Sequence, residues 1–426
     1  MLQNLLNGAF LGAVMHILVV SQYFLPEEFH INDIASSLCK KGIQVDVLTG
    51  QPNYPGGRIF SNYKWWGLGK NVVAGMRVFR VPLVPRGNSG SFRLLLNYCS
   101  FVLSALLFGP LLVRRQKYDA IMVYGTSPIL QAIPAIYLGF LKSAPVTLWL
   151  QDLWPESLAA TKHVRNETVL SAIRLLVGWI YRRTNLILIQ SRAFELSVRA
   201  ICRDTPIVYF PNSVDIAFVD GPRIDAPLPI LPELDDSFVV MLAGNVGIAQ
   251  APEVILEAAR LLQGVSQIRF VVLGQGSRWE SIRDQAKALG LRNLHLPGRF
   301  PVQTMPALMR KAAVLLVTLT DEPIFALTVP NKVQAYMAAG RPILACLNGE
   351  GARLVTEAQA GLSVPAENAR ALADAVMQLY NMPMDELAQM GANGRRYFKT
   401  HFDHDKLVDE LIAHLRALSN TPKDAR

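Results

Sequence analysis

The sequence predicts an α/β protein built from two doubly wound, mostly parallel sheets. Short apolar runs alternate with helical patterns along the chain, which is the order typical of parallel sheets covered by helices on both faces. The alternation stops in a proline-rich stretch at 219–236, which we interpret as a linker, and then begins again. With 426 residues, 51% of them hydrophobic, the chain is long enough for two domains with separate cores.

The first predicted domain covers residues 15–218. Its first strand is followed by a helix at 29–41, and Gly42 separates this helix from the next strand. Apolar runs rich in β-branched residues place its strands at 16–20, 45–49, 120–123, 146–150, 186–189 and 207–210.

The second predicted domain covers residues 237–395 and repeats the pattern. We expect its strands at 238–242, 270–273, 294–296, 314–317 and near 343, with helices at 252–263, 278–289, 304–311, 331–339 and 368–380. Open α/β sheets bind ligands at the carboxyl ends of their strands, so we expect the site in a cleft between the two domains.

The first 14 residues are apolar but lack a basic start and a clear cleavage site, which argues against a secretory signal. They are either a membrane-contacting tail or a segment ahead of a true start at Met15, and we favour the second interpretation. The four cysteines are far apart in sequence, which argues against a disulfide framework or a zinc site.

The net charge of +9 is unevenly distributed. Residues 15–215 contain 21 Lys and Arg against 11 Asp and Glu, whereas residues 216–426 contain 21 against 22. A basic half attracts polyanions, but no nucleic-acid-binding motif is present. We therefore expect contact with an anionic membrane surface and no nucleic-acid partner.

Residues 94–113 form an uncharged run bounded by Arg93 and by Arg114 and Arg115. The run is long enough to cross a membrane, since a span needs about 20 apolar residues. It lies between two strands of one sheet, however, where a crossing would put the next strand on the wrong side. We favour a buried crossover helix, and a helix lying in the membrane interface is the alternative.

Residues 330–344 are the most informative segment. Pro330 suits entry into a helix, and Gly340 suits its exit. Asn331 and Lys332 would then lie where free backbone N–H groups and the helix dipole favour an anion. The segment indicates a phosphate or diphosphate site, although an ordinary capped helix with a solvated lysine fits the same pattern.

Glycines also follow the first two strands of the second domain. Gly244, Asn245 and Gly247 follow one strand, and Gly274 and Gly276 follow the next. Glycine lets a ligand approach the backbone closely. Each turn alone is a weak signal, but together with Asn331, Lys332 and the neighbouring Gln334 the turns indicate a nucleotide diphosphate. We expect helix dipoles and Lys332, with no metal, to stabilise a departing diphosphate.

Acidic and aromatic residues follow strands of the first domain. Asp152 and Glu156 follow the strand at 146–150, where they would orient sugar hydroxyls or act as a base; Asp152 as a helix cap is the equal alternative. Glu27 lies in the turn after the first strand and faces either an acceptor or water. Tyr54 and Arg58 lie in a loop that suits a sugar-diphosphate acceptor.

At this point the chain resembles the GT-B glycosyltransferases of family 4, over residues 15 to about 418. The resemblance implies two Rossmann-like domains facing across a cleft, and a C-terminal helix at 396–418 that packs back on the first domain. It implies retaining transfer from a nucleotide-sugar without metal or cofactor, with the donor in the second domain and the acceptor in the first. The segments that carry it are 23–28, 52–55, 151–155, 210–215, 243–247 and 330–342.

Two features depart from the family pattern. Family 4 usually carries two glutamates around the helix near 331–339, and Leu327 and Ala335 occupy those places; Gln334 or Glu322 are candidate substitutes. Asn245 and Gln250 stand near the usual Arg and Lys, which leaves Lys332 as the main cation.

Within the family, the pattern is similar to bacterial O-antigen and capsule enzymes of the N-acetyl-L-fucosamine (fucosamine) transferase type, which are related to colanic acid transferases. This predicts transfer of a deoxyamino sugar from a UDP-sugar to a lipid-diphosphate-linked sugar in O-antigen, lipopolysaccharide, capsule or exopolysaccharide synthesis. The enzyme would be cytoplasmic and peripheral on the inner face of the cytoplasmic membrane. The alternatives are a GT-B sugar-nucleotide epimerase and a catalytically inactive membrane-associated partner.

Overall fold

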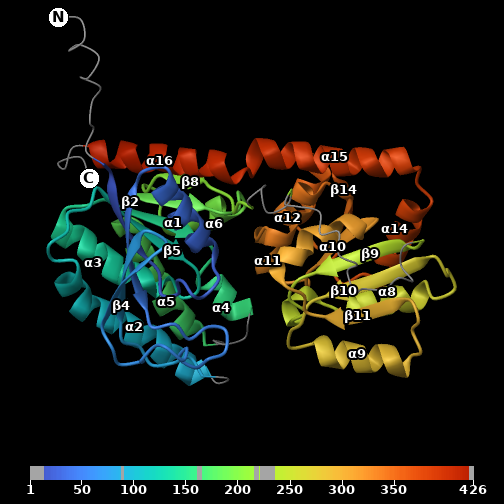
Figure 1. Ribbon diagram of the computed structural model, residues 1–426, viewed down its shortest axis with the longest axis horizontal. Helices are drawn as coiled ribbons and strands as arrows, with labels where there is room; N and C mark the ends of the chain where they lie inside the picture. Colours follow the sequence, from blue (N-terminus) through green and yellow to red (C-terminus); the bar gives the residue numbers. More distant parts are fainter. Residues whose placement is uncertain (1–13, 88–90, 161–165, 215–219, 221–235, 422–426) are drawn as a thin grey trace, which may run out of the picture. The chain divides into compact units, whose positions relative to one another are not determined.

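The computed structural model describes residues 14–87, 91–160, 166–214, 220 and 236–421 (Figure 1). These residues divide into two compact units. The first comprises the described residues within Met1–Gln190, Glu195–Phe210 and Val408–Arg426, and the second comprises those within Ser191–Phe194 and Pro211–Leu407. Each unit is an α/β domain around one sheet. The expected linker at 219–236 and the first 13 residues lie almost entirely outside the described residues.

The first unit contains an eight-stranded sheet in the order β3-β4-β2-β1-β5-β6-β7-β8. All neighbouring strands run parallel except β3 and β4, which pair antiparallel. The strands are β1 (His16–Val20), β2 (Gln44–Gly50), β3 (Gly69–Val73), β4 (Met76–Val81), β5 (Ala120–Gly125), β6 (Val146–Leu150), β7 (Leu186–Ile189) and β8 (Ile207–Tyr209).

The hairpin of β3 and β4 was not predicted from the sequence. Its two-residue turn uses Ala74 and Gly75 at φ of 50° and 82°, without the Asn-Gly pair that usually marks such a turn. β3 is also an edge strand with an exposed Lys70 and Asn71, so it lacks the apolar run that identified the buried strands.

Helices cover both faces of this sheet. The crossover through α1 leads from β1 to β2, and the crossover through α2 leads from β4 to β5, in the opposite direction across the sheet. Because such crossovers are right-handed, α1 and α2 lie on opposite faces. Helix α3 contacts both α2 and α5. The helices are α1 (His30–Lys40), α2 (Ser91–Leu112), α3 (Ala132–Lys142), α4 (Glu156–Ala160), α5 (Glu167–Arg183), α6 (Phe194–Ile201) and the part of α16 (His404–Asn420) from Val408 onward.

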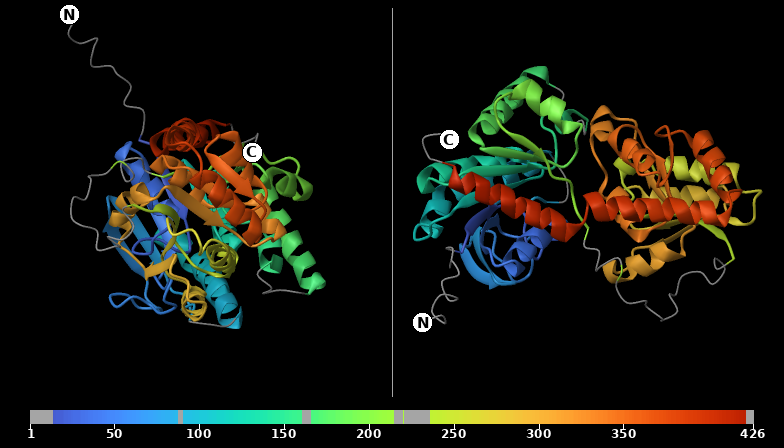
Figure 2. Two further views of the ribbon diagram at one scale, coloured as in Figure 1. Left: turned by 90° about the vertical axis from the view of Figure 1, so that its right-hand side faces the viewer. Right: turned by 90° about the horizontal axis from the view of Figure 1, so that it is seen from above.

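The residues of α16 from Val408 onward belong to the first unit although they come from the end of the chain (Figure 2). Val408, Leu411 and Leu415 are fully buried there. Asp409 forms an ion pair of 2.8 Å with Lys41, just after α1. A helix distant in sequence thus completes the first core.

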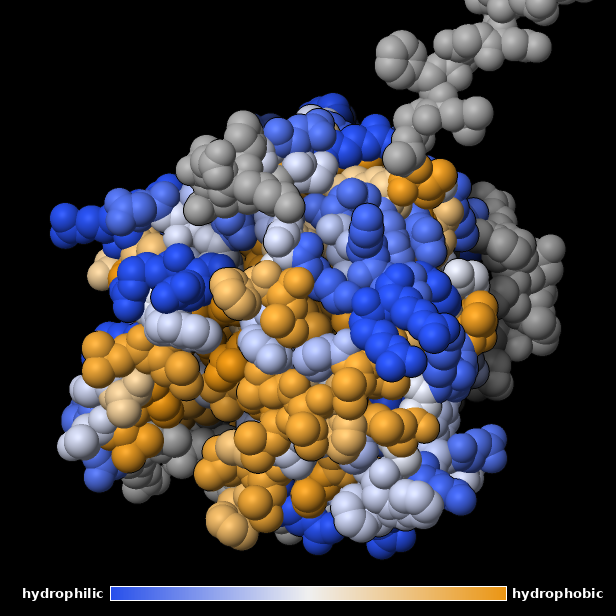
Figure 3. All heavy atoms as spheres, turned by 90° about the vertical axis from the view of Figure 1, so that its left-hand side faces the viewer, coloured by the Kyte–Doolittle hydropathy of each residue, from blue (hydrophilic) through white to orange (hydrophobic). Residues whose placement is uncertain are grey.

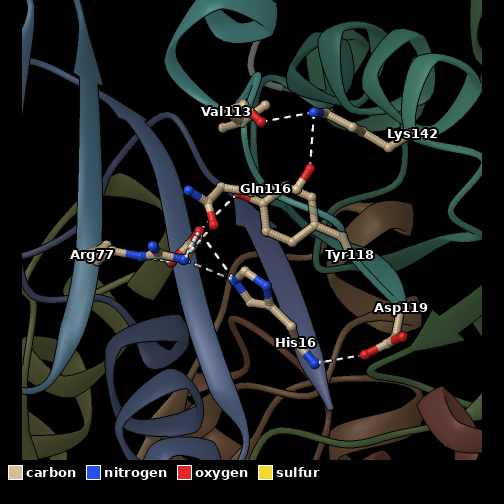
Figure 4. Close-up of polar contacts among 8 residues, drawn as sticks. His16, Arg77, Val113, Gln116, Tyr118, Asp119 and Lys142 are labelled. Carbon is tan, nitrogen blue, oxygen red and sulfur yellow. Dashed lines mark hydrogen bonds and ion pairs between the residues drawn. The ribbon is translucent and has the colours of Figure 1, made fainter. Parts of the chain in front are cut away.

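The amino ends of β1, β2 and β5 meet at a buried polar cluster around Asp46 (Figure 4). Arg77 donates to both carboxylate oxygens of Asp46, at 2.7 and 2.9 Å, and the Tyr118 hydroxyl donates at 2.8 Å. His16 Nε2 lies 3.1 Å from the same carboxylate. Burial alone would raise the pKa of Asp46, but these hydrogen bonds outweigh it and lower the pKa. The cluster fixes the sheet at the end away from the expected site.

The second unit contains a six-stranded parallel sheet in the order β11-β10-β9-β12-β13-β14. Its strands are β9 (Phe238–Ala243), β10 (Ile268–Leu273), β11 (Leu294–Gly298), β12 (Val314–Thr318), β13 (Ile343–Cys346) and β14 (Gly361–Val364). Its helices are α8 (Glu253–Leu261), α9 (Trp279–Ala288), α10 (Met305–Lys311), α11 (Pro323–Leu327), α12 (Asn331–Ala339), α13 (Glu350–Glu357), α14 (Ala369–Tyr380) and α15 (Met384–His401).

Alternate side chains of β9 pack into two separate hydrophobic cores, one on each face of the sheet. Val239 and Met241 pack with side chains of α10, α12, α13 and α15. Val240 and Leu242 pack on the opposite face with side chains of α8, α9 and α14. Both faces of the sheet are therefore buried, and the strands read as continuous apolar runs for this reason. The predicted α/β class with two Rossmann-like sheets is confirmed.

The uncharged run at 94–113 is a crossover helix, as favoured, but it is not a buried one. Within the described residues, α2 is long and apolar enough to cross a membrane by length and composition, and only 33% of that stretch is buried. The favoured interpretation is therefore wrong about burial, because one side of α2 packs on β4 and β2 while its other side faces outward.

Candidate functional site

In the second unit, Gly244 and Lys332 meet where β9 ends and α12 begins. A Cβ atom at Gly244 would lie 2.7 Å from Cε of Lys332, and the backbone has a φ of 132° there. The lysine side chain therefore passes directly over a position that only glycine can occupy without a shift. Its Nζ lies 3.5 Å from the backbone oxygen of Asn245.

The two glycine turns pack against each other at the level of their backbones. A Cβ atom at Gly274 would lie 1.8 Å from the carbonyl oxygen of Gly244, and one at Gly276 would lie 2.4 Å from that of Val246. The N–H of Val246 donates to the carbonyl of Gln275 at 3.0 Å. The turns predicted separately from the sequence thus form one surface at the carboxyl ends of β9 and β10.

Gln250 holds the first of these turns in place. Its Oε1 accepts hydrogen bonds from the N–H of Gly247 and from Nδ2 of Asn245, each at 3.0 Å. A Cβ atom at Gly247 would lie 2.8 Å from Nδ2 of Asn245. Asn245 and Gly247 therefore shape the turn, and the carbonyl of Asn245 points to the Lys332 ammonium.

The Lys332 ammonium is the main electrostatic feature of this surface. Burial lowers its pKa to about 8, and no carboxylate pairs with it among the residues that the structure describes. Within the described part of the chain, its one polar contact is the long hydrogen bond to the Asn245 carbonyl. A bound anion would supply the missing opposite charge and raise the pKa again. The site is thus prepared for a negatively charged group.

Helix α12 presents its N-terminus to the same place. Pro330 precedes the helix with φ of −64°, and Gly340 ends it in the left-handed region at φ of 68°, as predicted. Asn331 lies at the first turn, where its Oδ1 accepts a hydrogen bond of 2.7 Å from Asn212. The free N–H groups of this turn favour an anion beside Lys332.

Tyr336 fixes α12 to the end of β9, and sequence analysis did not identify it. Its hydroxyl accepts from the N–H of Ala243 at 2.9 Å and donates to the Ala243 carbonyl at 3.2 Å. Nothing in the local pattern distinguishes a tyrosine that bonds to a strand end from one that only packs.

Gln334 is buried in the same helix, at 1% exposure. Neither its Oε1 nor its Nε2 has a hydrogen-bond partner in the described part of the chain. A buried amide without partners is costly, which is unusual in a stable core. Its predicted part in nucleotide binding stays a prediction. Leu327 ends α11 and Ala335 lies within α12, so neither family glutamate position carries an oxygen ligand.

In the first unit, Glu27 holds the loop that carries Tyr54. Its carboxylate accepts from the backbone N–H groups of Phe24, Asn53 and Tyr54 at 3.2, 2.8 and 2.7 Å. Burial raises its pKa to about 7, although the three hydrogen bonds act in the opposite direction. Glu27 is only 2% exposed, so the expectation that it faces water is wrong, and its predicted contact with an acceptor stays a prediction.

Tyr54 belongs to an aromatic group at the carboxyl ends of β1 and β2. Its ring centroid lies 5.2 Å from that of Phe29 and 5.6 Å from that of Tyr23. The Arg86 guanidinium lies 5.3 Å over the Tyr54 ring. Arg58, in the same loop, is exposed. Sequence analysis found Tyr54 and Arg58 but missed Arg86, which comes from the segment after β4.

Asp152 and Glu156 follow β6. Oδ2 of Asp152 accepts from the Ser127 N–H at 2.8 Å, and burial raises the pKa of this carboxyl. Asp152 does not act as the cap of α4, since Glu156 begins that helix. The pKa of Tyr98 is raised, mainly by burial and to a smaller extent by Asp152 and Tyr54. Arg86 acts in the opposite direction and lowers it. Tyr98 therefore lies near both the Tyr54 loop and Asp152.

Oε2 of Glu156 is buried without a hydrogen-bond partner among the described residues. Gln151, which follows β6, and Gln190, which follows β7, also have buried amide atoms without partners among those residues. Among the described residues, no group of three or more His, Cys, Asp or Glu side chains could hold a metal ion.

Comparison with known proteins supports this division of the chain. The family described as "Glycosyl transferase 4-like domain" matches residues 28–213, and "Glycosyl transferases group 1" matches residues 237–382. Each match falls on one of the two sheets. The chain is a glycosyltransferase of group 1, family 4, as its sequence predicted.

Two bacterial relatives resemble it along most of their length. WbjE of Pseudomonas aeruginosa, described as a probable glycosyltransferase, is 26% identical over 344 residues, or 80% of this chain and 84% of that protein. WcaI of Escherichia coli K12, whose name assigns it to colanic acid biosynthesis as a glycosyl transferase, is 27% identical over 342 residues, or 76% of this chain and 82% of that protein.

Solved structures confirm the GT-B fold. Sucrose-phosphate synthase of Thermosynechococcus elongatus aligns with a TM-score of 0.72 at 17% identity, covering 95% of this chain and 99% of that one. HepE of Anabaena, in complex with UDP and glucose, aligns with a TM-score of 0.68 at 16% identity, covering 95% of this chain and 100% of the other. At these identities the likeness concerns the fold alone.

Proposed function

We propose that this enzyme transfers a sugar from a UDP-sugar to a lipid-diphosphate-linked sugar during synthesis of a bacterial surface polysaccharide. The observation that supports binding of the UDP-sugar donor is the Lys332 ammonium. It lies over Gly244 at the start of α12 without a carboxylate partner among the described residues. The complex of HepE with UDP supports a uridine diphosphate as the anion.

The polysaccharide context rests on the relatives. The name of WcaI refers to colanic acid biosynthesis, and the aligned region covers 82% of that protein. We extend this to a deoxyamino sugar donor, with N-acetyl-L-fucosamine as the candidate from the sequence resemblance. The same context favours a cytoplasmic enzyme, peripheral on the inner face of the membrane, because a lipid-linked acceptor is held there.

In the proposed reaction, the second unit stabilises the leaving diphosphate. Lys332 and the N–H groups of α12 would neutralise the charge that develops as the glycosidic bond breaks. The departing diphosphate or Asp152 would take the proton of the acceptor hydroxyl. Burial raises the pKa of the Asp152 carboxyl, which makes it a stronger base than an exposed aspartate when it is ionised.

The test is turnover by Lys332→Ala, which we expect to fall about 10²-fold or more if the ammonium stabilises developing charge. Lys287→Ala is the matched control, because this lysine is exposed in the last turn of α9 in the same unit. Wild-type turnover in Lys332→Ala, with the variant shown to be folded, would exclude the assignment. Mass spectrometry of lipid-linked products made from a panel of UDP-sugars would identify the donor.

A second candidate is an inactive protein that binds UDP and supports another enzyme at the membrane. Leu327 and Ala335 at the two family glutamate positions favour it, since neither side chain can hold a ribose or sugar hydroxyl. Tight UDP binding without transfer to any extracted lipid acceptor would support this reading. Release of an epimerised free sugar from UDP-sugar alone would instead indicate an epimerase.

A further inference from the structure

One side of helix α2 carries an apolar stripe that no other described element covers. Phe92, Leu96, Leu103, Leu107 and Leu111 are exposed, and they recur at intervals of four and seven residues, so they share one helix face. Leu103 and Leu107 each keep 66% of their surface exposed. Exposed side chains of this kind are common singly but not in a continuous row.

Helix α3 contacts α2 and extends the stripe. Its Tyr137, Phe140 and Leu141 are exposed, and Phe140 keeps 83% of its surface exposed. We call these outward residues of α2 and α3 the α2–α3 face. Figure 3 looks onto this side of the first unit, where hydrophobic side chains gather in a broad area bordered by hydrophilic ones.

The pair of helices is held rigidly at one end. The Lys142 ammonium, in the last turn of α3, donates to the backbone oxygens of Val113 and Gln116 just after α2, at 2.7 and 2.9 Å (Figure 4). The bonds join the C-terminal ends of the two helices. The α2–α3 face is therefore a fixed surface of the folded unit.

The opposite side of α2 is part of the core, which excludes a membrane crossing. Phe101 and Ala105 are fully buried, and so is Asn97. Oδ1 of Asn97 accepts from Nε2 of Gln22 at 2.7 Å, and its Nδ2 donates to Asn53 at 3.3 Å. Removing α2 to span a bilayer would break these bonds and open the core. Any contact of this helix with lipid would therefore have to be made by its outer side, with the helix lying flat on the surface.

The charges around this face select an anionic surface as the partner. Arg93 lies at one end of the stripe, and Arg114, Arg115 and Lys117 lie at the other. Residues 91–142 contain five Lys and Arg but one acidic residue. A second copy of the chain would bring like charges together around the apolar area, which is unfavourable. An anionic leaflet offers both an apolar interior and negative headgroups.

We propose that the α2–α3 face docks into the surface of an anionic lipid bilayer. Its leucines and phenylalanines lie among the upper acyl chains, and the arginines at its ends contact lipid phosphates. The proposal rests on the lipid-linked acceptor of the proposed function and names the surface that brings the enzyme to it. Through Asn97, α2 also bonds to Asn53 in the Tyr54 loop, so the docked helix begins beside the predicted acceptor residues.

The test measures binding of the full chain to vesicles by co-sedimentation. The vesicles contain phosphatidylcholine alone or phosphatidylcholine and phosphatidylglycerol in equal amounts. The double variant Leu103→Glu with Phe140→Ser removes apolar contact at the centre of the face, and both positions are exposed, so the fold is retained. The control is Leu196→Glu, which changes a leucine that is 82% exposed on α6 of the same unit.

We expect the wild type to bind the mixed vesicles and to dissociate as salt rises. The double variant should bind at least about tenfold more weakly, since each buried leucine or phenylalanine contributes enough for roughly that factor. Leu196→Glu should bind like the wild type. Equal binding of the double variant, or no binding of the wild type to either vesicle, would overturn the proposal.

Two further measurements separate this proposal from its alternatives. Sedimentation of a wild-type dimer that the double variant dissociates would show a second copy on the face and overturn the lipid assignment. UDP binding by calorimetry should be unchanged in the double variant. If the wild type binds the vesicles but transfers no sugar to a lipid-linked acceptor, the proposed function is refuted and the docking surface still holds.

Discussion

Alanine at Gly244 and alanine at Gly274 should give opposite phenotypes, although the two glycines lie side by side. Both have positive φ, of 132° and 145°, so a side chain at either position is strained by about 1–3 kcal/mol. The difference lies in what the new methyl group meets. At Gly244 it meets the flexible Lys332 side chain, and at Gly274 it meets the backbone carbonyl of Gly244.

Gly244→Ala should fold but lose affinity for UDP. A Cβ atom 2.7 Å from Cε of Lys332 is accommodated when the lysine rotates away, which moves the ammonium from the site. A hydrogen bond to a charged group contributes about 1.5–3 kcal/mol, so affinity should fall roughly ten- to hundredfold. The free energy of unfolding should fall only by the strain of about 1–3 kcal/mol.

Gly274→Ala should instead unfold the second unit or leave it barely stable. A Cβ atom 1.8 Å from a carbonyl oxygen cannot be accommodated without moving the backbone of β9 or β10. The cost adds to the strain and approaches the 5–15 kcal/mol that typically stabilises a domain.

Denaturant unfolding followed by circular dichroism measures the stability of each variant, and calorimetry measures UDP affinity. Gly264→Ala is the control, since nothing lies within 4 Å of a Cβ atom there. The reasoning is refuted if Gly274→Ala is as stable as the wild type. It is equally refuted if folded Gly244→Ala binds UDP with wild-type affinity.

Three other predictions follow from charges. The pKa of Lys332 is about 8 in the free protein, and a bound diphosphate raises it. UDP binding near pH 8 should therefore take up protons, and it should weaken as the pH rises further. Calorimetry in buffers of different ionisation heat measures the proton uptake, and uptake that persists in Lys332→Met would contradict the prediction. Asp46→Asn should destabilise the first unit by about 1–3 kcal/mol, because an amide in place of the fully buried carboxylate cannot accept from Arg77 and Tyr118 at both of its terminal atoms. Equal unfolding midpoints would count against that. Glu27 has a pKa of about 7 in the folded state, above its unfolded value, so the folded state binds more protons. The free energy of unfolding should therefore fall by on the order of 3 kcal/mol as the pH rises from about 5 to 8. Glu27→Gln should reduce this pH dependence of stability, and an unchanged pH dependence would exclude Glu27 as its source.

Local pattern predicted most of the α/β framework. The buried parallel strands read as apolar runs, since both sides of each strand face helices. The stop and start signals of α12 at Pro330 and Gly340 were also correct. The β3–β4 hairpin was missed, because its exposed edge strand and Ala74-Gly75 turn carry neither an apolar run nor a standard turn pair.

The sequence by itself determined the fold class and the enzyme family and named Lys332 as a candidate, because strand periods, helix caps and glycine turns are local properties of the chain. Tertiary structure decided which of those pieces touch. It placed Lys332 over Gly244, enclosed Glu27 in backbone N–H groups and left the outer side of α2 uncovered. Such outcomes depend on contacts between residues tens to hundreds of positions apart, which no local pattern encodes.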